Sequence, residues 1–135
     1  NAHGLSALES SNAKGGMDDK AYQEAVQKTK GTRKIIDDLM QANKLDAICG
    51  TSIGLACSID LINGDYDTGF YFCSPAAMAG YPHITVPMGK VHELPAGLSF
   101  IARPYEEGLL LAMAFSFEQA TKKRAKPGFI KTMIP

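Results

Sequence analysis

The fold of this chain is decided by the stretch Ser74-Pro-Ala-Ala-Met-Ala-Gly-Tyr-Pro-His-Ile-Thr-Val-Pro-Met-Gly89, which is followed by Leu94-Pro-Ala-Gly-Leu-Ser-Phe100. Small residues near 74–79 favour a short helix. The runs 83–86 and 97–102 are rich in β-branched and large apolar residues, which predicts two strands. The stretch therefore predicts a helix followed by two neighbouring strands.

The second predicted strand has a clear period of two. Leu98 and Phe100 should lie on one face, and Ser99 and Ile101 on the other. Pro87 has no amide hydrogen, so we expect it to end the first strand or to occupy a bulge.

The residues upstream of this stretch predict a helix and one more strand. Residues 1–16 are rich in Ser, Asn, Gly and Ala, and they are expected to form a flexible arm or the remnant of a purification tag. Asp18 can cap a helix that continues to Asn43 with apolar residues at near-helical spacing. The run Leu45-Asp-Ala-Ile-Cys49 then predicts a short buried strand.

A closing helix is predicted after Pro104, with an apolar face made of Leu109, Leu110, Met113 and Phe117. The whole pattern mixes helices and strands, with an N-terminal helix, three strands and a C-terminal helix. The expected class is therefore α/β (mixed).

Composition excludes several classes of function. The 14 Lys and Arg residues balance the 14 Asp and Glu residues, so no net field attracts nucleic acid or an anionic membrane. The longest apolar run, from Leu109 to Phe115, is far shorter than the ~20 residues needed to cross a bilayer. Three cysteines without a secretory signal fit a reducing cytoplasm better than a disulfide framework. We expect a protein of the cytoplasm that binds no nucleic acid and no membrane.

One local motif suggests a serine hydrolase. Gly50-Thr51-Ser52-Ile53-Gly54 fits the G-x-S-x-G pattern of a nucleophile elbow, with Asp60 and then His83 or His92 downstream in the order of a hydrolase triad. An elbow needs a substantial helix directly after it, and only about two turns fit before the turn-forming Asn63-Gly64. The alternative is a loop bounded by glycines.

No metal or cofactor site is expected. The cysteines and histidines lack zinc spacing, and Asp65-Tyr-Asp67-Thr-Gly69 lacks the distant glutamate of a calcium loop. His83 opens a strand, where a structural role is the simpler interpretation. Cys73 precedes the predicted short helix, a place where a thiol pKa can fall, although such cysteines usually fill space.

Several motifs, in a fixed order, resemble the C-terminal part of the amidase signature family. They are the helix from Tyr22, the Leu45-Asp-Ala strand, Ile59-Asp-Leu-Ile-Asn-Gly-Asp65, Ala76-Ala-Met-Ala-Gly-Tyr-Pro-His-Ile-Thr-Val-Pro87, Pro95-Ala-Gly-Leu-Ser-Phe100 and Glu118-Gln-Ala-Thr121. Within the family the chain looks similar to bacterial amidases described as 6-aminohexanoate-cyclic-dimer hydrolases. Residues 17–135 are then expected to be one segment of an amidase domain and of its large mixed sheet.

The resemblance implies amide hydrolysis by a serine, a second serine and a lysine that lie upstream of this segment. No catalytic residue is therefore assigned here. Four residues are expected at the rim of the substrate cavity: Thr51, Ser52, Tyr71 and Cys73. The implied partners are the missing N-terminal part of the same enzyme and a small-molecule amide, with no cofactor.

Two further expectations remain open at the level of sequence. The domain-like length of 135 residues also fits a self-contained binding module. If the chain is a segment of an enzyme, its isolated form should expose apolar surface and sheet edges, and should therefore self-associate.

Overall fold

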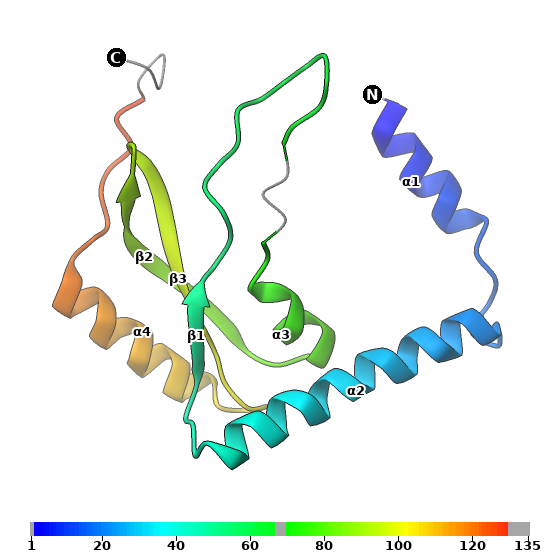
Figure 1. Ribbon diagram of the computed structural model, residues 1–135, viewed down its shortest axis with the longest axis horizontal. Helices are drawn as coiled ribbons and strands as arrows, with labels where there is room; N and C mark the ends of the chain where they lie inside the picture. Colours follow the sequence, from blue (N-terminus) through cyan, green and yellow to red (C-terminus); the bar gives the residue numbers. More distant parts are fainter. Residues whose placement is uncertain (1, 67–69, 130–135) are drawn as a thin grey trace.

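The computed structural model describes residues 2–66 and 70–129, which form four helices and one antiparallel sheet of three strands (Figure 1). In chain order they are α1 (Ala2–Asn12), α2 (Lys20–Ala42), β1 (Ile48–Thr51), α3 (Cys73–Ala79), β2 (His83–Val91), β3 (Leu94–Ile101) and α4 (Glu107–Thr121). The predicted mixed α/β class is confirmed.

Strand β3 is the centre of the sheet, which has the order β1-β3-β2. Its side chains alternate as the sequence predicts. Phe100 belongs to a core shared with Leu110 of α4, whereas Ile101 belongs to a second core shared with Met40 of α2. One strand therefore supplies both faces of the molecule with apolar side chains.

The sheet lies between two helical layers (Figure 1). On one face, Leu110 and Ala114 of α4 pack against Val86 of β2. On the other face, α2 and α3 pack together, and Ala76 of α3 is almost fully buried there. The two cores lie on opposite faces of a single sheet.

The β2–β3 hairpin is longer than predicted. Strand β2 does not end at Val86 but continues to Val91, with a register shift between Pro87 and Gly89. The shift is a bulge, one of the two alternatives predicted for Pro87. His92 and Glu93 both have positive φ angles, as a two-residue turn between twisted strands requires.

Two element boundaries differ from the prediction. Asp19 rather than Asp18 caps α2, and its carboxylate accepts a hydrogen bond of 2.8 Å from the amide of Ala21. Strand β1 begins at Ile48, and its residues alternate between half-buried and exposed positions. The predicted strand over 45–49 was therefore placed early and was wrong in being fully buried, because β1 is an edge strand that covers part of one sheet face.

The two ends of the chain supply two more corrections. Residues 2–12 form helix α1 where a loop was expected, and the described side chains of this helix, from Leu5 onward, are exposed. In α4, Leu110 and Ala114 are buried, but Leu109 is exposed rather than part of the packed face. The sequence pattern missed this difference because α4 is apolar around most of its circumference.

Two polar contacts attach α2 to the chain that follows α3. The hydroxyl of Tyr81 donates a hydrogen bond of 2.6 Å to the Asp37 carboxylate. Arg33 Nε donates one of 2.6 Å to the carbonyl oxygen of Ala79. Burial, followed by the bond to Asp37 and its negative charge, raises the pKa of Tyr81 to about 12.

We expect Tyr81→Phe to lower the free energy of unfolding by about 1.5 kcal/mol, because Asp37 loses its donor. Between pH 10 and about 12 only the unfolded state releases the Tyr81 proton, so the wild type should lose stability over this range. The variant should lose less. Urea unfolding at pH 7 and at pH 11 measures both effects, with Tyr105→Phe, at a tyrosine that is 95% exposed, as the control.

Candidate functional site

Ser52 lies where the chain leaves β1, and its backbone is fixed on both sides. Its amide donates to the carbonyl oxygen of Gly97 at 2.9 Å, and its own carbonyl accepts from the amide of Phe72 at 3.0 Å. A single antiparallel bridge then joins Ile53 to Tyr71. The segment after β1 is therefore held between β3 and the residues that precede α3.

Three hydroxyl groups meet beside Ser52 on one sheet face. Ser99, which is fully buried, donates to the Ser52 hydroxyl at 2.6 Å and lies 2.8 Å from the hydroxyl of Thr85. Ser52 and Thr85 are 3.4 Å apart. A hydroxyl both donates and accepts, so the three groups satisfy one another without any charged residue.

Two glycines allow this close approach. A Cβ atom at Gly97 would lie 2.7 Å from Ser52 Oγ and 2.8 Å from Thr85 Cγ2, and one at Gly50 would lie 2.8 Å from the Phe72 ring. No side chain fits at such distances without displacing its neighbours. Both glycines are therefore required by packing, which in a strand often marks a close approach of this kind.

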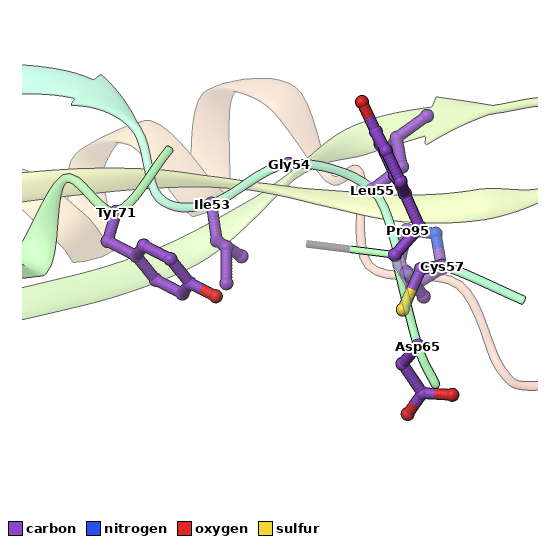
Figure 2. Close-up of a pocket in the computed structure, with 9 residues that line it drawn as sticks. Ile53, Gly54, Leu55, Cys57, Asp65, Tyr71 and Pro95 are labelled. Atoms are coloured by element: carbon purple, nitrogen blue, oxygen red, sulfur yellow. The ribbon is translucent and has the colours of Figure 1, made fainter. Parts of the chain in front are cut away.

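A cavity of about 420 Å³ lies beside this segment (Figure 2). Its lining is mainly apolar and aromatic: Ile53, Gly54, Leu55, Ala56, Cys57, Asp65, Tyr66, Tyr71 and Pro95. Figure 2 shows Ile53 and Tyr71 on one side, with Cys57 and Asp65 across from them. A cavity of this size with few polar groups suits the apolar part of a small organic molecule.

The turn below the cavity is built on Asp60. Its carboxylate accepts hydrogen bonds from the amides of Ile62 and Asn63, both at 2.9 Å, and from the Asn63 side chain at 3.0 Å. The bonds from the amide and side chain of Asn63, together with that from the Ile62 amide, hold the pKa of the Asp60 carboxyl below its usual range. Asp60 is thus occupied in fixing the turn.

The structure brings together only some of the residues predicted for a cavity rim. Tyr71 lines the cavity, and Ser52 directly precedes Ile53 of its lining. Thr51 pairs with Leu98 and so lies on the opposite sheet face, away from the three hydroxyls. Cys73 is exposed as the first residue of α3, within the helix rather than ahead of it, and does not line this cavity.

Sequence reasoning missed Asp65 and Pro95 as lining residues. Pro95 belongs to β3 and reaches the cavity only through the pairing of strands, which the local sequence does not reveal. Asp65 gave a weak signal, because Asn63-Gly64-Asp65 was recognised as a turn without any indication of what it faces.

The arrangement around Ser52 does not form a nucleophile elbow. The residues after Gly54 are irregular, so the helix that an elbow requires is missing from the described chain between Gly54 and Tyr66. The Ser52 hydroxyl bonds the hydroxyls of Ser99 and Thr85. Asp60, the expected acid of a triad, caps its own turn.

Other candidate sites can be located as well. His83 opens β2, with its ring centre 6.5 Å from that of Phe72. Across residues 2–66 and 70–129, no three His, Cys, Asp or Glu side chains are grouped as metal ligands would be. Asp67 of the weak calcium pattern lies outside the described residues. Within the same ranges no helix is long and apolar enough to cross a membrane.

Comparison with known proteins gives a consistent set of relatives, although no family model matches the chain. A probable amidase from Arabidopsis thaliana is 37% identical over 120 residues, which are 87% of this chain and 20% of the plant protein. A glutamyl-tRNA(Gln) amidotransferase from Clostridium kluyveri is 31% identical over 112 residues, which are 79% of this chain and 22% of the bacterial protein. The chain thus spans about a fifth of the length of these curated relatives.

Solved structures give the same proportion. The native peptide amidase from Stenotrophomonas maltophilia has a TM-score of 0.71 and 34% identity, covering 90% of this chain and 24% of its own. A peptide amidase in complex with the competitive inhibitor chymostatin has a TM-score of 0.76 and 35% identity, covering 90% of this chain and 25% of its own. Nine-tenths of the chain therefore match a quarter of an amidase in both sequence and fold.

We expect Gly97→Ala to destabilise the chain by about 1–3 kcal/mol, because the added methyl group must displace Ser52 or Thr85. The matched control is Gly31→Ala in α2, where an added Cβ meets nothing within 4 Å. That change should stabilise the chain by about 0.5–1 kcal/mol, since alanine favours the helix. Chemical denaturation of both variants measures the two signs, and equal effects would contradict the packing described around Gly97.

Proposed function

We infer the function from one premise: this chain belongs to the amidase signature family. We propose that it is a segment of an amidase that hydrolyses carbon–nitrogen bonds of small-molecule amides. The observation that carries the proposal is the match of nine-tenths of the chain to a quarter of a peptide amidase.

The catalytic residues of such an enzyme are proposed to lie upstream of this segment. Amidases of this family use a serine nucleophile activated through a second serine and a lysine, with backbone amides stabilising the oxyanion. This sequence contains no Gly-Gly-Ser-Ser run that could supply them. The chain is therefore proposed to be inactive alone.

The role of the segment is proposed to be scaffolding, with one contribution to the substrate cavity. Helix α4 supports this role because it is apolar on two sides. Leu110 and Ala114 face the sheet, while Leu111 and Phe115 are 61% and 64% exposed. A helix that is apolar all round is normally buried, so a further layer of protein is expected over its outer face.

The proposed partner is the remaining N-terminal part of the same enzyme. Strands β1 and β2 are both edges of the three-stranded sheet and can each pair with a further strand. The Nε2 atom of His83 is buried without a hydrogen-bond partner among the described residues. Buried polar atoms of native proteins are normally paired, so a group from the rest of the enzyme is a fitting partner.

The likeness to 6-aminohexanoate-cyclic-dimer hydrolases makes cyclic amides one proposed substrate class. The cavity beside Ser52 is proposed to form part of the substrate wall, with Tyr71 as a lining residue. We also propose a cytoplasmic setting, because Cys49, Cys57 and Cys73 are all free thiols in this fold.

We expect the purified 135-residue chain to release no ammonia from peptide amides above the rate of a buffer blank. The physical reason is that no activated nucleophile is present. Turnover by the chain that disappears in Ser52→Ala, but not in Ser116→Ala on α4, would contradict the proposal and identify Ser52 as a nucleophile.

The isolated chain should also self-associate through the outer face of α4. Replacing Leu111 and Phe115 together by lysine should weaken association at least tenfold, since each buried large apolar side chain contributes about 1.5–3 kcal/mol. Light scattering over a concentration series measures the change, and Gln119→Lys is the control on the same helix. A wild-type chain that stays monomeric at high concentration would favour a self-contained binding module instead.

A further inference from the structure

The turn that follows the β1 exit segment fixes the position of one carboxylate. The amide of Asp60 donates a hydrogen bond of 3.0 Å to Asp65 Oδ1. Asp60 is itself held by the amides of Ile62 and Asn63, and Gly64 provides the positive φ angle that the turn requires. These bonds determine where the Asp65 side chain lies relative to the cavity.

Asp65 is the one carboxylate in the lining of the 420 Å³ cavity, and no lysine or arginine lines it. Its Oδ1 atom accepts from the Asp60 amide, and no hydrogen bond to Oδ2 is formed within the described part of the chain. The rest of the lining is apolar or aromatic, with Ile53 and Tyr71 across the cavity from Asp65 (Figure 2). The cavity therefore combines an apolar wall with a single negative charge.

We propose that this cavity binds a substrate group that has an apolar body and a cationic end, and that Asp65 selects for the positive charge. Resting on the proposed function, the inference names the substrate class as amides that carry an ammonium or guanidinium group away from the bond that is cleaved. A carboxylate held by a backbone amide keeps acceptor capacity for a charge-assisted hydrogen bond.

The lining makes discrimination against anions and neutral groups effective. An anion would meet the Asp65 carboxylate without any compensating cation among the lining residues. A neutral alkyl chain would fill the apolar part but would leave that carboxylate to water. An ammonium group satisfies the carboxylate, and the tyrosine rings of the lining tolerate a nearby cation better than aliphatic side chains do.

Binding of n-pentylammonium and of 1-pentanol to the full 135-residue chain tests the inference, because the two probes differ mainly in charge. Titrations followed by amide nuclear magnetic resonance should show shifts at Gly54 and Asp65, with the ammonium bound about fivefold more tightly. Asp65→Asn should remove this preference while keeping the oxygen that accepts from Asp60. Asp65→Glu should retain part of the preference.

The matched control is Asp38→Asn, which makes the same change of charge on α2 outside the cavity and should leave the preference intact. Equal affinity for the two probes, no binding of either, or a preference that persists in Asp65→Asn would overturn the inference. The assay needs no catalysis. Lost selectivity alongside amide hydrolysis by the complete enzyme would reject this inference alone, whereas retained selectivity without hydrolysis would reject the proposed function alone.

Discussion

Strand β3 holds the molecule together because its successive side chains leave it on opposite faces, and each face has its own helical layer. Phe100 joins the core under α4, and Ile101 joins the core under α2 and α3. Between them Ser99 is fully buried and bonds the hydroxyls of Ser52 and Thr85. A shift of β3 by one residue would exchange the two faces, so its register with β1 and β2 determines both cores and the place of the cavity.

The two helical layers differ in how complete they are. Helix α2 is amphipathic, with Ile36 and Met40 buried and mostly polar residues outside, which suits the surface of a protein. Helix α4 is apolar on its outer face as well, and both edge strands of the sheet lie open to pairing. These features explain why a chain of 135 residues matches a quarter of a peptide amidase rather than the whole of one.

The sequence predicted the parts of the fold that local periodicity determines. The alternation of Leu98 to Ile101 follows from the pleat of a strand, and Pro87 marks its bulge because it lacks an amide hydrogen. Boundaries were less predictable, since Asp18 and Asp19 have equal capping chemistry and only the geometry of the turn selects Asp19. The cavity could not be derived, because Asp65 and Pro95 meet through strand pairing and a turn of several hydrogen bonds rather than through sequence spacing.

The central claim is that this chain is a structural quarter of an amidase. A chimera tests it most directly, in which this chain replaces the matching quarter of the Stenotrophomonas maltophilia peptide amidase, with peptide amide hydrolysis measured beside the parent enzyme. The account predicts a folded, monodisperse chimera that hydrolyses the amide, because the apolar outer face of α4 and the sheet edges regain their cover. A folded chimera without activity, or one in which the outer face of α4 stays exposed, would contradict the account.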